Sequence, residues 1–224
     1  DVHAGEIVGI AGVSGNGQRE LAEAIFGLRE IAAGSITLNG TTITSPTPQQ
    51  VRQLGLAYVP EERMRDGAIG EFTVAENLML VDYVAPPFTQ RGLLNATAIE
   101  QRSGELIDGY GVKTPTMHTP TRHLSGGNIQ KVVIAREFSS SSDALVVAQP
   151  TRGVDIGAAE YIHERLLEQR SSGSAILLIS EDLDEIMQLS DRIIVVLEGE
   201  IMGEVSRADA TVKGIGLLMT GVTE

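Results

Sequence analysis

Cysteine is absent from the 224-residue sequence, which excludes disulfides and every site that needs a thiolate. Long apolar runs are missing too, because stretches such as 144–148 and 193–197 are far shorter than the roughly 20 residues of a membrane helix. Basic residues are few, with 17 Lys and Arg against 30 Asp and Glu, so the net charge is −13. We therefore expect no nucleic-acid partner.

The stretch Glu6–Phe26 combines an apolar run, a glycine-rich turn and a helical pattern. Gly12 and Gly17 have the spacing of the phosphate-binding loop G-x-x-x-x-G-K-[ST], whose backbone N–H groups surround a phosphate. Gln18 and Arg19 stand where that pattern has its Lys and its Mg²⁺-binding Ser or Thr. Taken alone, the glycines fit a tight turn without a ligand equally well. The candidate nucleotide-binding residues are Gly12, Val13, Ser14, Gly15, Asn16, Gly17, Gln18 and Arg19.

Strand and helix patterns alternate along much of the chain. Apolar runs at 56–59, 144–148, 175–180 and 193–197 predict buried strands, and helical patterns separate the last three. Such alternation predicts an α/β fold with a mainly parallel sheet flanked by helices. Asn39-Gly40 predicts a hairpin, and hence a small antiparallel β element beside this sheet. Asp182 and Glu185 have the spacing of a capping box.

Helix signals replace strand-like runs for about eighty residues after Glu61. Thr73 and Glu76 form a capping box, and further helices are expected at 96–107 and 129–138. We therefore expect a core formed by residues 1–60 and 141–224 and an inserted helical subdomain at residues 61–140. The chain begins at Asp1 without a start Met and soon reaches its first strand, so it is expected to belong to a longer polypeptide.

The order and spacing of four motifs resemble the ATP-binding domain of ABC transporters. They are the glycine loop at 12–17, LSGGN at 124–128, the strand end QPT at 149–151 and RGVD at 152–155. The forms LSGGNIQKV and PTRGVDIGA are similar to the second ATP-binding half of tandem-domain importers for simple sugars and nucleosides. The resemblance implies a P-loop NTPase-type fold and a peripheral place at the cytoplasmic face of the cell membrane.

Six positions that carry the chemistry of this family differ here. The resemblance places Gln18 at the phosphate-loop Lys, Arg19 at the Mg²⁺ ligand, Ala148 at the metal-ordering Asp and Gln149 at the catalytic Glu. It places Glu181 at the switch His that follows the next strand, and Glu61, within one position, at the Gln that follows the strand at 56–59. Phosphoryl transfer depends on charge neutralisation and positioning, so no competent catalytic residue is expected. The resemblance thus implies weak or absent ATP binding and no metal at this chain's own site.

The signature motif is intact, and its residues are Leu124, Ser125, Gly126, Gly127 and Asn128. Family members pair head to tail, so that each signature closes over nucleotide held by the opposite domain. Ser125 and its neighbours would present N–H groups and a hydroxyl at a helix N-terminus, and Asp155 matches a dimer-interface aspartate. The resemblance implies a degenerate half of an importer, which acts in trans on the ATP and Mg²⁺ site of another ABC domain. That partner would be the N-terminal half of the same polypeptide, and a membrane permease the other partner.

Several alternatives stay open at this point. The chain could be a stand-alone ATPase rescued by Arg19 and a relocated carboxylate, or an ABC-type domain that works without a transporter. Leu124–Asn128 could serve only as a helix cap, and Arg19 could be a solvated residue of the first helical turn. The apolar residues around Phe72 and Met79 could form subdomain core or a docking surface for the permease.

Overall fold

The computed structural model describes residues 1–140 and 142–222, and the chain divides into two compact units. The first unit comprises residues 1–58, 142–150 and 163–224. The second comprises residues 59–141 and 151–162. Helix α6 (Ile156–Ser171) contributes residues to both units.

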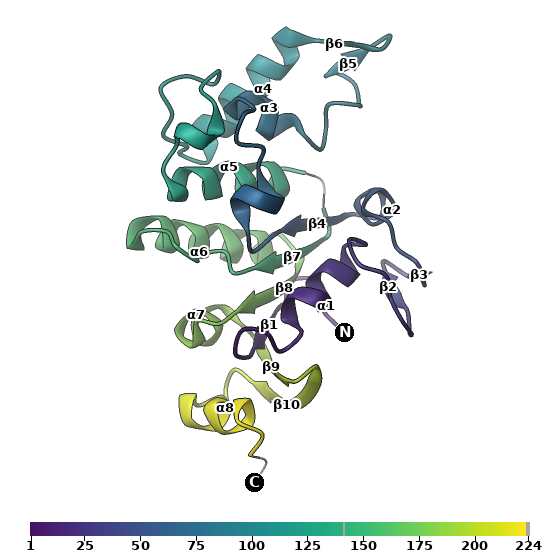
Figure 1. Ribbon diagram of the computed structural model, residues 1–224, viewed down its shortest axis with the longest axis vertical. Coiled ribbons are helices and arrows are strands. Elements are labelled where there is room, and N and C mark those ends of the chain that lie inside the picture. The colour runs from purple at the N-terminus through teal and green to yellow at the C-terminus, as the bar shows by residue number, and fades with distance from the viewer. Residues whose placement is uncertain (141, 223–224) are drawn as a thin grey trace. The chain divides into compact units, whose positions relative to one another are not determined.

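A six-stranded sheet runs through the first unit (Figure 1), in the order β10-β9-β1-β8-β7-β4. Strand β1 pairs in parallel with β8 and β9, and β8 pairs in parallel with β7, whereas β10 returns antiparallel to β9. The predicted mainly parallel sheet is confirmed. The strands are β1 (Ile7–Ala11), β4 (Leu56–Val59), β7 (Ala144–Ala148), β8 (Ala175–Ser180), β9 (Arg192–Leu197) and β10 (Glu200–Ser206).

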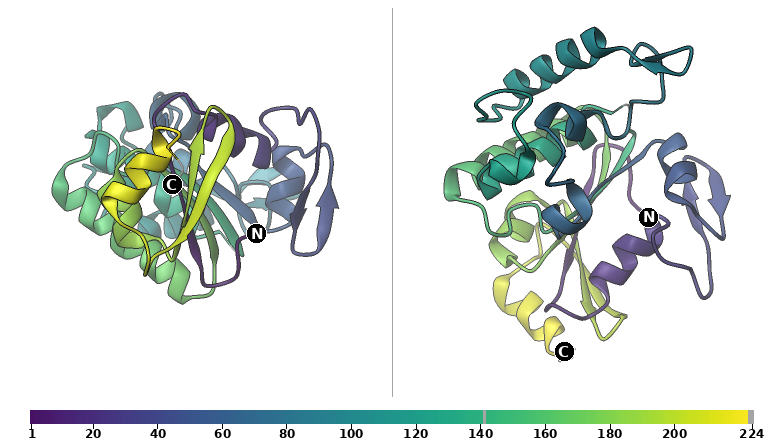
Figure 2. Two further views of the ribbon diagram at one scale, coloured as in Figure 1. Left: turned by 90° about the horizontal axis from the view of Figure 1, so that it is seen from below. Right: turned by 45° about the horizontal axis from the view of Figure 1, so that its top comes forward.

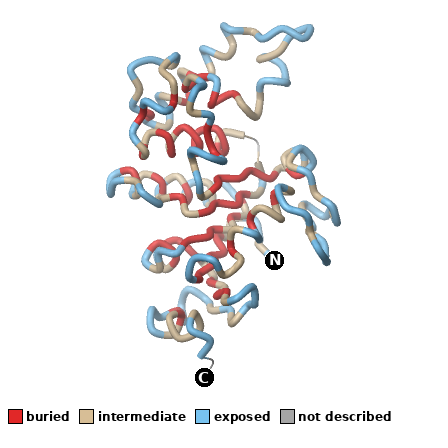
Figure 3. Tube along the Cα trace, viewed as in Figure 1, coloured by how far each residue is buried: buried red, intermediate tan, exposed pale blue. Residues whose placement is uncertain are grey.

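Side chains on β1 point alternately to the two faces of this sheet. Ile10 belongs to a buried cluster with Ala22 of α1 (Gln18–Ile25) and Val51 of α2 (Pro48–Gln53). Gly9 faces α7 (Leu183–Leu189), where a Cβ at this position would lie 2.2 Å from the Oγ of Ser190. Helices therefore cover both faces, and Figure 3 shows buried residues along the central strands of this sheet.

Two further elements complete the first unit. Strands β2 (Ile36–Leu38) and β3 (Thr41–Ile43) form the predicted hairpin, in which Asn39 and Gly40 both have positive φ. This hairpin is a separate two-stranded sheet beside α2 (Figure 2). Helix α8 (Val212–Met219) packs against β9 and β10.

The second unit is built on three helices that pack against one another, α3 (Val74–Met79), α4 (Ala96–Gly109) and α5 (Gly126–Phe138). Thr73 and Glu76 form the predicted capping box of α3. Two short helices, η1 (Arg63–Gly67) and η2 (Thr121–His123), lie in the connections.

The structure corrects three local predictions. Helix α5 begins at Gly126 instead of residue 129, because Ser125 is its N-cap. Two paired strands of two residues each, β5 (Thr89–Gln90) and β6 (Leu93–Leu94), lie in the region that was expected to contain no strands. The predicted capping box at the start of α7 does not form. Asp182 caps the helix, but the Glu185 carboxylate binds His163 and does not return to the backbone of Asp182.

Candidate functional site

The predicted positions of the first unit meet at one edge of the sheet. Strands β1, β8 and β7 are parallel neighbours, so their carboxyl ends lie together. The 12–17 loop follows β1, Ala148 ends β7, and Glu181 follows β8. Gln149 joins two of these ends, because its Oε1 accepts the N–H of Glu181 at 3.3 Å. In α/β sheets this edge is the usual place for a ligand.

The loop after β1 has the backbone of a glycine-dependent turn. Gly15 and Gly17 have φ of 87° and 98°, a region that side chains with a Cβ rarely adopt. Gly17 is also the N-cap residue of α1, whose first turn receives no side-chain cap. The expected order of strand, glycine turn and helix is therefore present.

The side chain of Gln18 occupies the interior of this loop. It is 7% exposed; its Nε2 donates to the carbonyl of Val13 at 3.1 Å, and its Oε1 accepts the N–H of Asn16 at 3.1 Å. A Cβ at position 12 would lie 2.4 Å from Gln18 Nε2 and 2.7 Å from the backbone oxygen of Val196, and the backbone oxygen cannot move aside as a side chain can, so this position requires glycine. A neutral amide thus stands inside the loop and already uses one backbone donor that an anion would need.

Asn16 attaches the same loop to the turn between β9 and β10. Its Nδ2 donates to the Val13 carbonyl at 2.9 Å, and its Oδ1 accepts the N–H of Glu198 at 2.8 Å. The backbone carbonyl of Asn16 accepts the N–H of Gly199 at 3.0 Å. The side chains of Asn16 and Gln18 thus bind backbone groups of this loop and of the turn between β9 and β10.

Arg19 pairs with a neighbour on its own helix. Its Nε lies 2.7 Å from Oε1 of Glu23, and Arg29 binds the other oxygen of that carboxylate at 2.9 Å. Burial raises the pKa of Glu23, but the hydrogen bonds from Arg19 and Arg29 outweigh it and hold the pKa below its usual value. The Arg19 guanidinium is therefore engaged along α1.

The signature residues of the second unit lie at the start of α5. Ser125 is exposed, and its Oγ accepts the backbone N–H of Asn128 at 3.4 Å and the Nδ2 of the same residue at 2.9 Å. Gly127 and Leu124 are buried, so Ser125 and the first turn behind Gly126 provide the accessible groups. Ser125 does cap the helix, and this cap leaves its hydroxyl at the surface.

Asp155 and Glu61 also lie in the second unit. Asp155 is exposed, and its Oδ1 accepts the N–H of Ala158 at 2.9 Å at the start of α6. Glu61 forms an ion pair with Arg152, and Glu62 lies 3.6 Å from the same guanidinium. The negative charge of Glu61 is thus balanced within its own unit.

Sequence reasoning gave no role to Arg63 or Arg152, although both touch predicted site residues. Arg152 pairs with Glu61 across 91 positions of sequence, and Arg63 reaches the loop that carries Asp155 across about the same separation. The charges of opposite sign were visible in the sequence. Nothing local in the sequence indicates which charges pair.

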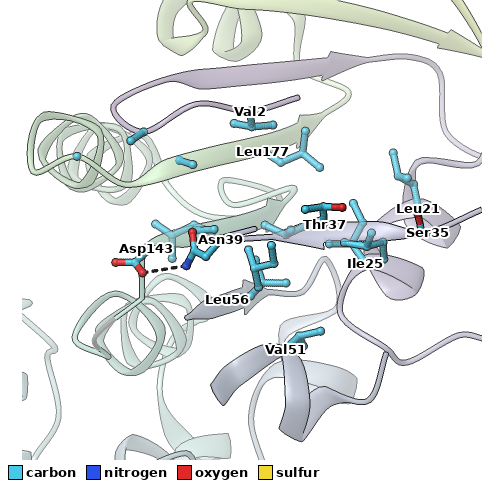
Figure 4. Close-up of a pocket in the computed structure, with 18 residues that line it drawn as sticks. Val2, Leu21, Ile25, Ser35, Thr37, Asn39, Val51, Leu56, Asp143 and Leu177 are labelled. Carbon is cyan, nitrogen blue, oxygen red and sulfur yellow. Dashed lines mark hydrogen bonds between the residues drawn. The ribbon is translucent and has the colours of Figure 1, made fainter. Parts of the chain in front are cut away.

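A cavity of about 640 Å³ in the first unit contains none of the predicted site residues. Figure 4 shows it between β2, α1 and the first residues of β7 and β8, with Leu21, Ile25 and Leu177 on its walls. Its polar edge is a hydrogen bond of 3.0 Å from Asn39 Nδ2 to Asp143 Oδ2. The cavity lies at the amino-terminal end of those strands, whereas the glycine loop follows the carboxyl end of β1.

No helix within residues 1–140 and 142–222 is long and apolar enough to cross a membrane. In the same described part of the chain, no three His, Cys, Asp or Glu side chains are grouped as metal ligands.

Comparison with known proteins identifies relatives of the whole chain. The sequence pattern of the family described as ABC transporter matches residues 1–152. The guanosine import ATP-binding protein NupO of Bacillus subtilis is 47% identical over 223 residues, which are 100% of this chain and 44% of that protein. The glucose import ATP-binding protein TsgD13 of Haloferax volcanii is 46% identical over 98% of this chain and 40% of its own. The chain therefore spans less than half the length of these relatives.

Solved structures share the fold at lower sequence identity. A nucleotide-free ATP-binding cassette from an ABC transporter matches with a TM-score of 0.81 and 21% identity, covering 100% of this chain and 90% of its own. A dimeric, post-hydrolysis cassette bound to ADP and phosphate matches with a TM-score of 0.78 and 21% identity, covering 92% and 88%. These matches show that the chain shares the fold of these cassettes.

Proposed function

Because this chain belongs to the ABC transporter family of ATP-binding domains, we propose that it is a catalytically degenerate half that acts in trans. Its own glycine loop binds ATP weakly or not at all. Its signature, Leu124–Asn128, closes over ATP and Mg²⁺ held by a partner domain. The partner carries the competent loop, and hydrolysis there drives an importer.

The position of Gln18 carries this proposal. A Lys at this place would bring a positive charge to the phosphates, whereas the Gln18 amide is neutral and is bound to Val13 and Asn16. Ala148 and Gln149 replace the carboxylates that order the metal and polarise the water, and Glu181 replaces the switch histidine. Loss of one stabilising donor typically costs about 3–4 kcal/mol of barrier, so the combined loss leaves no useful turnover.

The signature supports the second half of the proposal. Ser125 is exposed at the N-terminus of a 13-residue helix, where the helix dipole and free N–H groups favour an anion. Its Oγ, as hydroxyl donor, and the first backbone N–H groups of α5 would bind the terminal phosphate of ATP held by the partner. Asp155, exposed beside this helix end, would contact the partner domain.

The length of the relatives supports a partner within the same polypeptide. This chain matches less than half of the guanosine and glucose import proteins. We infer that an N-terminal ATP-binding half completes the protein, that the cargo is a nucleoside or a simple sugar, and that a membrane permease is the other partner. The assembly would lie peripherally on the cytoplasmic face of the membrane.

An apolar groove of the second unit supports docking of the permease. It has a volume of about 290 Å³ and is lined by Phe72, Met79, Tyr83 and Leu94 among others. Phe72 and Tyr83 are 40% and 49% exposed, more than expected for subdomain core. We propose that a short apolar segment of the permease occupies this groove.

Calorimetric titration of this chain with ATP and Mg²⁺, beside a phosphate-release assay, tests the proposal. We expect no turnover and weak or undetectable binding that does not change with Mg²⁺. The matched variant carries Gln18→Lys, Arg19→Ser, Ala148→Asp and Gln149→Glu, and it should bind nucleotide more tightly. Tight Mg²⁺-dependent binding with turnover by the unaltered chain would instead establish a stand-alone ATPase.

A further inference from the structure

Arg63, the first residue of η1, lies between the signature and the loop that follows β7. Its Nη1 donates to the carbonyl of Arg152 at 2.6 Å, and its Nη2 donates to the carbonyl of Gly153 at 3.1 Å. All of these residues belong to the second unit. One guanidinium therefore holds two successive carbonyl groups of the segment that leads to Asp155, a geometry that suits the planar fork of arginine.

The same guanidinium fills the space beside the first residue of α5. A Cβ at Gly126 would lie 2.6 Å from Nη2 of Arg63 and 3.4 Å from the carbonyl oxygen of Gly153. A Cβ at Gly127 would lie 3.4 Å from Oδ2 of Asp155. The two signature glycines thus allow this close approach of the helix start, the arginine and the 152–155 segment.

Acidic neighbours do not neutralise Arg63. Within residues 1–140 and 142–222 no carboxylate lies within 4 Å of its guanidinium, and Glu61 and Glu62 pair with Arg152 instead. Its guanidinium instead donates hydrogen bonds to the two backbone carbonyls. Without it, those partly negative oxygens would stand uncompensated next to the helix end that is to receive an anion.

We propose that Arg63 is a positioning residue of the signature, a role that rests on the function proposed above. It fixes the first turn of α5 against the segment carrying Asp155, and it offsets the carbonyls of Arg152 and Gly153. Ser125 and the N–H groups behind it are thereby held in one arrangement toward the partner's nucleotide. The trans site consequently depends on a side chain outside the signature itself.

The first test uses the full-length protein, with kcat and KM for ATP measured in Arg63→Ala and Arg63→Lys. Arg63→Ala should lower kcat by roughly 10- to 100-fold, as small misplacements of positioning groups do, with KM changed much less. Arg63→Lys should restore only part of the loss, because an ammonium group is a compact donor that cannot replace the planar fork. Arg65→Ala is the matched control, since this arginine of η1 pairs with Asp66 and should retain full activity.

Two comparisons separate this inference from the function on which it rests. If Ser125→Ala lowers kcat but Arg63→Ala does not, the proposed role of Arg63 is wrong, whereas the proposal that the signature acts in trans is supported. If Ser125→Ala leaves kcat unchanged, the trans function itself is wrong. If Arg63→Ala and Arg65→Ala lower kcat equally, the effect belongs to η1 in general and Arg63 has no special role.

A double-mutant cycle tests the contact without relying on activity. Gly126→Ala should displace the guanidinium, so its effect on the urea midpoint should be much smaller in the Arg63→Ala background than in the unaltered protein. Additive shifts of the midpoint would mean that Arg63 does not occupy the space beside Gly126, and the proposal would fail.

Discussion

Glu185 is an acidic side chain that is almost completely withdrawn from solvent, with an exposure of 2%. Its Oε1 lies 2.9 Å from Nε2 of His163, and its Oε2 is buried with no hydrogen-bond partner among the described residues. The pair joins α7 to α6, and α7 follows the loop that contains Glu181. Burial of a carboxylate is tolerated when it is paired, so His163 stabilises the buried Glu185.

Removal of one partner of this pair should therefore destabilise the fold. We expect His163→Ala to lower the free energy of unfolding by about 3 kcal/mol, because Glu185 would stay buried without its partner. Urea denaturation measures this change, with His118→Ala, an exposed loop histidine, as the control. The double variant His163→Leu with Glu185→Leu should be less destabilised than the single variant. Equal stability of His163→Ala and His118→Ala would show that the pair contributes nothing.

Helix α3 is joined to the segments around it by one buried amide. Asn77 is 0% exposed, and its Nδ2 lies 2.9 Å from the carbonyl of Ile69, 3.1 Å from that of Thr73 and 2.9 Å from Oγ1 of Thr121, acceptors that share its two hydrogens. Its Oδ1 accepts the N–H of Ile69 at 2.8 Å. The six-residue helix is too short to be stable alone, so these bonds, together with its packing against α4 and α5, hold it in place.

Truncation of Asn77 should leave several buried polar groups without partners. We expect Asn77→Ala to cost about 2–4 kcal/mol of unfolding free energy, the range for losing a buried hydrogen-bond network. Gln101→Ala, on the exposed side of α4, is the control and should stay within about 0.5 kcal/mol of the parent. Urea midpoints compare the two, and similar midpoints would contradict the importance of the network.

Most secondary-structure elements could be predicted because their signals are local. The Asn39-Gly40 hairpin, the Thr73–Glu76 capping box and the apolar runs of β7 and β8 depend on neighbours a few residues away. The two-residue strands β5 and β6 were missed because so short a pair has no periodicity to read. The assignment of residues 61–140 to a separate helical subdomain stays a prediction.

Ion pairs connect the two ends of the chain in the first unit. Arg192 on β9 binds Glu6, which precedes β1, at 3.0 Å and Glu204 on β10 at 2.7 Å. Burial raises the pKa of Glu6, but the hydrogen bond and charge of Arg192 outweigh it, so this pKa lies below the usual value of 4.5. Hydrogen bonds to Glu6 and Glu204 in turn raise the pKa of Arg192. Glu23 has a lowered pKa for the corresponding reason.

These shifts predict a loss of stability in acid. A carboxylate with a lowered folded pKa stabilises the protein above its unfolded pKa, and this contribution disappears as the pH falls through the folded value. The melting temperature should therefore decline below about pH 4.5. At pH 7, Glu6→Gln should have a lower melting temperature than the parent, equivalent to a loss of about 1–2 kcal/mol of unfolding free energy. In acid the melting temperatures of the two proteins should converge. A constant difference between the two proteins at all pH values would contradict this linkage.

The chain's place among ABC ATP-binding domains and its α/β class were evident in the order of its residues, whereas the six replaced family positions stay a prediction. Motif spacing and local periodicity are enough to predict the family and the fold class, because both signals lie in short stretches whose conformation depends on neighbouring residues. The contacts that give the replaced positions meaning required the folded chain. Gln18 occupies the loop, Arg152 neutralises Glu61, and Arg63 reaches Gly126 and the 152–153 carbonyls, because folding brings particular polar groups within hydrogen-bond distance. A side chain with several possible partners binds the one that the tertiary fold places beside it, and sequence separation carries no information about that choice.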